Sequence, residues 1–317
     1  MDIKELYKLY QQHPVITTDS RDCPAGSIFI ALKGAAFNGN QFAAMALEKG
    51  CSYAVIDEPE YKQNDRFILV DDCLQTFKDL AREHRRQFQI PVIGITGTNG
   101  KTTTKELISA VLSEKYNVLY TQGNFNNDVG VPKTLLRLKP EHEIAVIEMG
   151  ASHPGDIKTL VETVEPTCGL ITNVGRAHLQ GFGSFEGVKK TKGELYDYLK
   201  SEELRVKSEE CSDGIVFINA DNEHLMEMAL ERGLKHLVKY GQEAENVAVR
   251  GRVTRCDPFL NFEWKKEDSS LFTLHLSAPT ISTTCWQPSR WDCSLTSANR
   301  LSAMLWKTMY QATTAHN

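Results

Sequence analysis

One stretch of the chain has the residue types and spacing of a phosphate-binding loop. It reads Ile95-Thr96-Gly97-Thr98-Asn99-Gly100-Lys101-Thr102-Thr103 and lies between a short apolar run and a helical pattern. Glycines let backbone N–H groups wrap a phosphate, the lysine reaches the outer phosphates, and the next hydroxyl can ligate Mg²⁺. Ile95 stands where the general pattern has its first glycine, so only the second half matches. The alternative is a glycine-rich turn with an exposed lysine, and the flanking elements favour a nucleotide-binding loop.

The elements around this loop indicate how it is held. Strand-like and helical segments alternate from residue 88 onward, with near-continuous apolar strands. We expect strands at 90–95, 117–120, 144–148, 169–173 and 214–219, and helices at 102–116, 132–138 and 154–164. This alternation predicts a mainly parallel sheet with helices on both faces. A smaller α/β unit precedes it, with a boundary near residue 88.

Bulk properties exclude several classes of function. The 317 residues fit two or three domains, and a net charge of -5 gives no basic field for nucleic acid. No apolar run approaches the roughly 20 residues of a membrane span. The first residues have no signal-peptide pattern, so we expect a cytoplasmic protein. The eight cysteines have no metal-binding spacing.

Further blocks, in order along the chain, resemble the Mur ligase and folylpolyglutamate synthase superfamily. The phosphate loop itself, from Thr96 to Thr103, has the particular sequence that is typical of this superfamily. The other blocks are Asn124-Phe125-Asn126-Asn127, Glu148-Met149-Gly150-Ala151, the run from Ile171 to Leu179, Lys190-Thr191-Lys192-Gly193-Glu194 and Asn219-Ala220-Asp221-Asn222. Near the start, Asp19-Ser20-Arg21 and Phe37-Asn38-Gly39-Asn40 resemble the UDP-sugar-binding domain of the Mur ligase family. The resemblance covers residues 16 to about 245.

Within that family, the blocks look most like the branch that joins D-alanyl-D-alanine to UDP-N-acetylmuramoyl-tripeptide. The resemblance implies an ATP-dependent, carbon–nitrogen bond-forming ligase of peptidoglycan precursor synthesis, with ATP and Mg²⁺ as cofactors. The γ-phosphate of ATP would move to the terminal peptide carboxylate, and the dipeptide amine would attack the acyl phosphate. We also expect a monomer that, on its charge and apolar content, binds neither nucleic acid nor membrane.

The resemblance assigns residues to roles. The implied ATP-binding residues are Gly97, Thr98, Asn99, Gly100, Lys101, Thr102, Thr103 and Asn219. The implied metal ligands are Thr102, Glu148, His178 and Lys192, the last as a carbamate, and the catalytic residues are Lys101, Lys192 and His178. The implied substrate-binding residues are Ser20, Arg21, Asn38, Gly39, Asn126 and Asn127.

Each assignment has a structural alternative. Lys192 would otherwise be a solvated surface lysine, His178 a polar core residue and Glu148 a surface acid. Asn126 and Asn127 would be turn formers, and Ser20 with Arg21 a turn followed by a salt-bridged surface arginine.

The pattern breaks after about residue 272. Trp286 and Trp291 stand among polar residues without a helical or strand period. If residues 284 to 317 are written as codons and read from one base earlier, a permitted choice of bases gives the family-like runs Met-Leu-Ala-Ala-Val-Thr-Val-Gly-Leu-Phe-Phe and Gly-Asn-Asn-Arg-Ser-Gln. We therefore expect a UDP-sugar-binding domain at 1–87, an ATP-binding domain at 88–272 and an out-of-frame tail at 273–317.

This tail stands where the family has its third domain. We expect it to be disordered from about Leu274, and the chain to keep nucleotide and UDP-sugar recognition without efficient ligation. Two alternatives stay open: a folylpolyglutamate synthase-like ligase, against which Asp19-Ser20-Arg21 argues, and a non-catalytic nucleotide-binding remnant.

Overall fold

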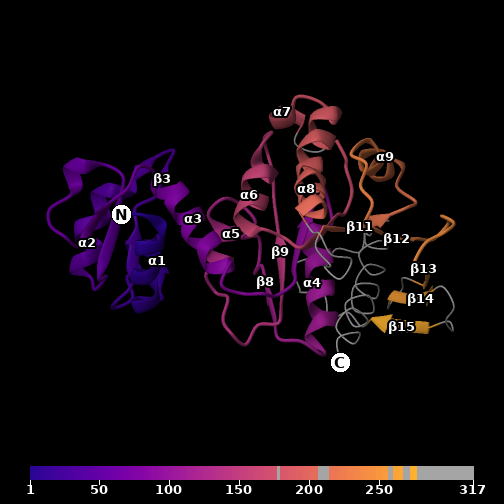
Figure 1. Ribbon diagram of the computed structural model, residues 1–317, viewed down its shortest axis with the longest axis horizontal. Helices are drawn as coiled ribbons and strands as arrows, with labels where there is room; N and C mark the ends of the chain where they lie inside the picture. The colour runs from indigo at the N-terminus through magenta and orange to yellow at the C-terminus, as the bar shows by residue number, and fades with distance from the viewer. Residues whose placement is uncertain (177–178, 206–213, 256–259, 267–271, 277–317) are drawn as a thin grey trace. The chain divides into compact units, whose positions relative to one another are not determined.

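The computed structural model describes residues 1–176, 179–205, 214–255, 260–266 and 272–276 (Figure 1). The chain forms two compact units. Unit 1 comprises residues 1–89 and 128–138, and unit 2 comprises residues 90–127 and 139–317. Among the described residues, no helix combines the length and the apolar character that crossing a bilayer requires.

Unit 1 is built on a parallel sheet with the strand order β1-β2-β5-β6, and a short hairpin, β3-β4, lies outside it. The central strands β2 and β5 are apolar and buried, as strands covered on both faces must be. The elements are α1 (Ile3–Gln12), β1 (Ile16–Thr17), β2 (Ile28–Ile30), β3 (Lys33–Gly34), β4 (Phe37–Asn38), η1 (Gly39–Phe42), α2 (Ala43–Glu48), β5 (Tyr53–Ile56), η2 (Pro59–Tyr61), β6 (Phe67–Leu69), α3 (Cys73–Arg85) and α5 (Gly130–Leu135).

Helix α5 belongs to unit 1, although the expected boundary assigned all of 88–272 to the ATP-binding domain. Leu136 packs against the core of unit 1. The Tyr10 hydroxyl donates to the Leu136 carbonyl at 3.0 Å, and His84 Nε2 lies 3.0 Å from the Leu138 carbonyl. These two hydrogen bonds give the buried side chains of Tyr10 on α1 and His84 on α3 a partner. The segment 128–138 therefore completes the packing of unit 1.

Unit 2 contains a sheet in which nine described strands follow the order β15-β14-β13-β12-β11-β10-β7-β9-β8. Its pairings are parallel from β8 to β13, and β14 and β15 are antiparallel. The elements are β7 (Val92–Thr96), α4 (Lys101–Ser113), β8 (Val118–Tyr120), β9 (Ile144–Glu148), α6 (Asp156–Val164), β10 (Cys168–Ile171), α7 (Leu179–Phe182), α8 (Phe185–Arg205), β11 (Ile215–Asn219), α9 (Glu223–Glu231), β12 (Leu237–Gly241), β13 (Val249–Arg255), β14 (Leu260–Lys266) and β15 (Phe272–Leu276). The expected α/β class with a mainly parallel central sheet is confirmed.

Helices cover both faces of this sheet (Figure 1). Ile93 and Ile95 of β7 share a core cluster with Ile108 of α4. The alternate residue, Gly94, faces Leu195 of α8, because side chains of a strand point to opposite faces in turn. Helices α4 and α8 therefore pack on opposite faces, with the loop between β7 and α4 at the sheet edge.

The antiparallel strands β13 to β15 lie beyond the pattern that the sequence predicted. Strand β15 pairs with β14 from Phe272 to Leu276, so regular structure continues past Leu274, from which we expected disorder, and into the expected tail at 273–317. Residues 277–317, which carry most of the expected out-of-frame tail, lie outside the described residues.

Candidate functional site

The candidate site lies at the carboxyl edge of the parallel sheet. Strand β7 stands between β9 and β10, and the chain reaches β8 and β9 on one side before it crosses to β10 on the other. The register pairs Ile95 with Glu148 and Thr96 with Ile171, so all three strands end at one level. In open α/β sheets, ligands bind outside the carboxyl ends of strands where the order reverses in this way.

The loop between β7 and α4 depends on two glycines. Gly97 and Gly100 have φ values of 143° and 76°, in the region that side chains disfavour. A side-chain carbon on Gly97 would also collide with the Thr172 hydroxyl. Lys101 begins α4, and its ammonium donates to the carbonyls of Gly97 and Thr98 at 2.9 and 3.1 Å. Burial lowers the pKa of Lys101, and the charge of Glu148 partly opposes that shift.

Residues that follow β10 brace this loop. The Asn173 carbonyl accepts the backbone N–H of Thr98 at 3.0 Å, and its side-chain oxygen accepts that of Asn99 at 3.1 Å. The Thr172 hydroxyl donates to the Asn99 carbonyl at 2.7 Å. The loop shape is therefore set by two strands, while the first turn of α4 keeps N–H groups that have no acceptor within the helix. The sequence prediction assigned no role to Thr172 or Asn173.

Glu148, at the end of β9, is the buried acid of the site. Its Oε1 accepts hydrogen bonds from the Thr102 hydroxyl at 3.1 Å and from Asn126 Nδ2 at 2.8 Å. Its Oε2 is buried without a hydrogen-bond partner among the described residues. The surface-acid alternative is therefore wrong, because Glu148 is 0 % exposed.

The Asn-rich loop reaches Glu148 through one of its two predicted residues. The Asn126 carbonyl also accepts the N–H of Gly150 at 2.7 Å, which ties this loop to the end of β9. Asn127 is exposed. The structure thus brings Asn126, Thr102 and Glu148 together, three residues that the sequence prediction assigned separately to substrate and to metal.

Lys192 lies on α8 and is 2 % exposed, so it is no solvated surface lysine. Its ammonium stands 5.6 Å from the centre of the Phe182 ring. Burial, and next the charge of Lys101, lower the pKa of Lys192 to about 8, while Asp156 and Glu194 act in the opposite direction. An amine with this pKa has a substantial neutral fraction near neutral pH. His178 lies outside the described residues.

A second polar loop follows β11 at the same sheet edge. Asn219 ends β11, and its side-chain oxygen accepts the N–H of Asp221 at 3.1 Å. The Asp221 carboxylate accepts the backbone N–H groups of Glu243 and Ala244 at 3.1 and 2.7 Å. Asn219 therefore shapes this loop.

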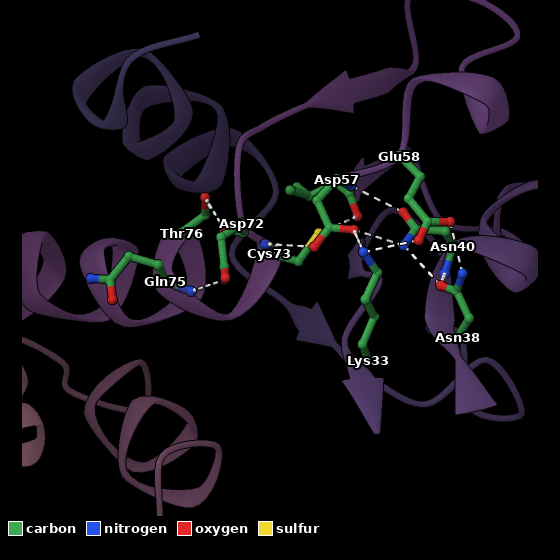
Figure 2. Close-up of polar contacts among 10 residues, drawn as sticks. Lys33, Asn38, Asn40, Asp57, Glu58, Asp72, Cys73, Gln75 and Thr76 are labelled. Carbon is green, nitrogen blue, oxygen red and sulfur yellow. Dashed lines mark hydrogen bonds and ion pairs between the residues drawn. The ribbon is translucent and has the colours of Figure 1, made fainter. Parts of the chain in front are cut away.

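In unit 1, the predicted residue Asn38 belongs to a polar network around the hairpin β3-β4 (Figure 2). Asn38 donates to Glu58 at 2.7 Å and accepts from Asn40 at 2.9 Å. Lys33 pairs with Asp57 and Glu58, both at 2.9 Å. Gly39 lies against the backbone of the residues after β2, where a side chain would collide. The network holds the hairpin in one conformation.

Ser20 and Arg21 form a turn near the start of unit 1. Arg21 donates to both carboxylate oxygens of Asp19, at 2.9 and 2.7 Å, and this bonding is the main reason that the pKa of Asp19 is lowered. The Ser20 carbonyl accepts the Lys49 ammonium at 2.9 Å. This geometry is that of the turn with a salt-bridged surface arginine.

Lys105 is a further charged residue at this site, and the sequence prediction missed it. It lies on α4 one turn after Lys101, is 0 % exposed, and places its ammonium 3.9 Å from Glu148 Oε2. The spacing of four residues on a helix was the available signal, because it puts both lysines on one face.

Comparison with known proteins gives this arrangement a family. Residues 14–93 match the model of the Mur ligase family, catalytic domain, and residues 95–277 match that of the Mur ligase middle domain. The UDP-N-acetylmuramoyl-tripeptide–D-alanyl-D-alanine ligases of Synechocystis sp. and Escherichia coli are 40 % and 39 % identical over 73 % of this chain. The chain spans about half the length of these relatives, 49 % and 48 %.

Solved structures agree with the sequence comparison. MurF ligase from Thermotoga maritima, crystallised in complex with ADP, superposes with a TM-score of 0.78 at 29 % identity, over 94 % of this chain and 64 % of that one. MurF from Acinetobacter baumannii gives a TM-score of 0.75 at 27 % identity, over 95 % and 64 %. The middle-domain model alone matches more than half of the sequence. The chain therefore belongs to the Mur ligase family.

Proposed function

We propose that this chain supplies the nucleotide and UDP-sugar sites of an ATP-dependent ligase that joins D-alanyl-D-alanine to UDP-N-acetylmuramoyl-tripeptide. One observation carries the proposal: Thr102, Asn126 and the buried Glu148 meet beside a phosphate-loop lysine at the carboxyl edge of the sheet. The names of the matched relatives supply the substrates.

ATP would bind along the loop of Gly97, Thr98, Asn99, Gly100, Lys101, Thr102 and Thr103, with Asn219 shaping the loop on the adenine side. The Lys101 ammonium now donates to two carbonyls of its own loop. On binding, it would exchange these neutral acceptors for the β- and γ-phosphates, with which hydrogen bonds are stronger because both partners are charged. The helix N-terminus adds further positive potential.

The residues around Glu148 fit Mg²⁺. The Oε2 atom is buried and has no hydrogen-bond donor among the described residues, and the Thr102 hydroxyl lies beside the same carboxylate. Mg²⁺ is usually held by one or two carboxylates together with substrate phosphates, and Glu148 with the Thr102 hydroxyl offers oxygen ligands of this kind. When bound, Mg²⁺ would neutralise phosphate charge during phosphoryl transfer.

Lys192 would act as a carbamate. The ammonium would first lose one proton, and the neutral amine would then attack CO₂, forming a nitrogen–carbon bond as a carbon–oxygen π bond opens and releasing a second proton to solvent. The two proton losses convert a buried cation into an anion. The lowered pKa of Lys192 favours the neutral amine that this step needs. The carbamate oxygens would then serve, with His178, as ligands of a second Mg²⁺.

The reaction would proceed in two displacements. The terminal carboxylate of the peptide attacks the γ-phosphorus of ATP, and ADP leaves. The D-alanyl-D-alanine amine attacks the acyl carbon, phosphate leaves and the amine loses a proton. Asn126 and Asn127 would orient the carboxylate, and Ser20, Arg21, Asn38 and Gly39 would hold the UDP-sugar. The protein mainly neutralises charge and positions the two anions.

Calorimetry with the purified chain tests this proposal. Both ATP with Mg²⁺ and UDP-N-acetylmuramoyl-tripeptide should bind. Lys101→Ala should weaken ATP binding at least about tenfold, because a charge-assisted contact is lost, and should leave UDP-sugar binding unchanged. Lys115→Ala is the control, because Lys115 is exposed and follows the C-terminal end of α4, whereas Lys101 begins that helix. Unchanged ATP affinity in Lys101→Ala would refute the nucleotide site, and binding of a folate in place of the UDP-sugar would favour the folylpolyglutamate synthase-like alternative.

A further inference from the structure

Lys105 is a buried cation in the midst of the site, and the phosphate loop does not use it. Its side chain is 0 % exposed on α4. Burial of an ammonium is costly unless charged or polar partners surround it. The ammonium lies 2.9 Å from Glu106 Oε1 and 3.2 Å from the Gly123 carbonyl, and the Tyr120 ring centre is 6.0 Å away.

The contact between Lys105 and Glu148 is incomplete. The ammonium stands 3.9 Å from Glu148 Oε2, which is beyond hydrogen-bond range but close enough for a strong charge interaction at a buried position. Oε2 itself accepts no hydrogen bond from the described residues. Lys105 thus neutralises Glu148 without occupying that oxygen.

Glu106 is a second acid that pairs with the Lys105 ammonium. Glu106 is 40 % exposed, whereas Glu148 is 1 % exposed at its side chain. The closer partner, at 2.9 Å, is therefore the solvated one. If a metal ion takes Glu148, Lys105 keeps its bond to Glu106 and its bond to Gly123, so the exchange leaves no unpaired buried charge.

We propose that Lys105 is the resident counter-ion of Glu148: a positioning residue that neutralises the buried carboxylate while no metal is bound and competes with a divalent cation for it. The proposal rests on the function proposed above, in which Glu148 is a metal ligand. Lys105 then lowers the affinity of the site for metal alone, so that the metal binds firmly only together with nucleotide phosphates, which bring compensating negative charge.

The test uses Mn²⁺ alone, without nucleotide, at one fixed pH, with binding measured by electron paramagnetic resonance. Lys105→Met keeps the length of the side chain and removes its charge. It should bind Mn²⁺ about tenfold more tightly than the wild type, because close charge pairs couple at least this strongly. It should also melt at a lower temperature without metal and gain more from Mn²⁺. Lys105→Arg should restore near-wild-type affinity, because it keeps the charge.

A second variant should change the Mn²⁺ affinity in the opposite direction. Glu106→Gln removes the alternative partner at a half-exposed position that should tolerate change, so Lys105 relies more on Glu148 and Mn²⁺ binding should weaken several-fold. A purely structural lysine would leave the affinity of Lys105→Met unchanged or lower it, and either result overturns the inference, as does an unchanged Glu106→Gln.

Glu148→Gln separates this inference from the proposed function. Loss of Mn²⁺ binding in Glu148→Gln supports the metal site whatever Lys105 does. Wild-type affinity in Glu148→Gln would refute the metal role of Glu148, and the counter-ion role of Lys105 with it.

Discussion

At the scale of residues, the site gathers positive charge around one acid. Lys101 and Lys105 both interact with Glu148, and Lys101 in turn lowers the pKa of Lys192. Glu148 is the buried acid among these three ammonium groups, whereas Glu106 beside Lys105 and the acids that act on Lys192, Asp156 and Glu194, are partly exposed. A polyphosphate supplies the missing negative charge, so the unliganded site is poised for an anionic ligand.

Lys192 gives a residue-scale prediction with a defined pH dependence. Its neutral amine, which becomes abundant as the pH rises through about 8, is the form that reacts with CO₂. Incorporation of isotope-labelled bicarbonate, followed by NMR, should therefore rise with pH through this range and level off above it. Lys190→Ala is the matched control, because Lys190 is exposed two residues earlier on α8. Labelling that survives in Lys192→Ala, or disappears in Lys190→Ala, contradicts the carbamate assignment.

The sequence analysis identified the site residues that belong to a recognisable motif. Glu148 and Thr102 were both assigned, and the structure joins them by a 3.1 Å hydrogen bond. It gave no role to Lys105 or to Asn173. The spacing puts Lys105 on the helix face of Lys101, but the burial of that face depends on packing between segments that are distant in the sequence. The contact of Asn173 with the loop likewise depends on which strand lies next to β7.

At the scale of elements, a pair of glycines lets α8 approach the sheet. Gly94 and Gly169 are paired across β7 and β10, and both face Leu195. A side-chain carbon on Gly169 would lie 2.7 Å from the Gly94 carbonyl oxygen, a backbone atom that cannot move aside. Close packing here fixes the distance of α8, and hence of Lys192, from the loop.

We predict that Gly169→Ala lowers the free energy of unfolding by about 1–3 kcal/mol, because the added methyl group overpacks the core and forces the backbone to move. Gly193→Ala is the comparison. There the new carbon meets only the end of the Arg232 side chain, which can move, and alanine favours the helix, so a change below about 1 kcal/mol is expected. Urea unfolding measures both. Equal losses would mean that the backbone contact of Gly169 is not limiting.

In unit 1, the buried His84 of helix α3 makes contacts that should be sensitive to acid. His84 Nδ1 lies 3.1 Å from the Tyr7 hydroxyl, and its Nε2 lies 3.0 Å from the Leu138 carbonyl. A carbonyl only accepts, so Nε2 carries the proton and neutral Nδ1 accepts from Tyr7. Burial lowers the pKa of His84 below its ordinary value of 6.5.

The sign of the resulting pH dependence follows from linkage. Below pH 6.5 the unfolded chain binds this proton more readily, so the stability that neutral His84 contributes is present above pH 6.5 and lost as pH falls toward the folded pKa. His84→Gln should be less stable at neutral pH, and its acid slope should be shallower by at most about 1.4 kcal/mol per pH unit. Urea titrations at neutral and acidic pH test this. Gln75→Ala, an exposed change on the same helix that removes no proton-binding group, is the control.

The alternation of strands and helices predicted the strands β7, β8, β9, β10 and β11 and the helices α4 and α6, because period and apolar content are local. Helix α5 was predicted as a helix, but its membership of unit 1 was not, since that depends on Leu136 and Leu138 meeting α1 and α3. Strand β13, which pairs in parallel with β12, and the antiparallel strands β14 and β15 belong to no part of the pattern that we recognised.

At the scale of the whole molecule, unit 1 is assembled from two separate stretches of chain. We predict that residues 1–89 alone melt at a lower temperature and bind more apolar dye than the same residues joined by a flexible linker to 128–138. The shorter fragment exposes core that Val129 and Leu136 cover, and leaves Tyr10 and His84 without their carbonyl partners. A linker followed by a shuffled 128–138 sequence is the control. Equal melting of all three would show that the segment adds nothing.

The divided unit 1 has a consequence for synthesis on the ribosome. The chain passes between the units at residues 89, 127 and 138, so unit 1 cannot close until residue 138 has emerged. By then β7 and α4 have also emerged, but β9 and β10, between which β7 lies, have not. The nascent protein must therefore carry an apolar strand without neighbours while its first unit folds. The phosphate loop is translated early and becomes ordered late.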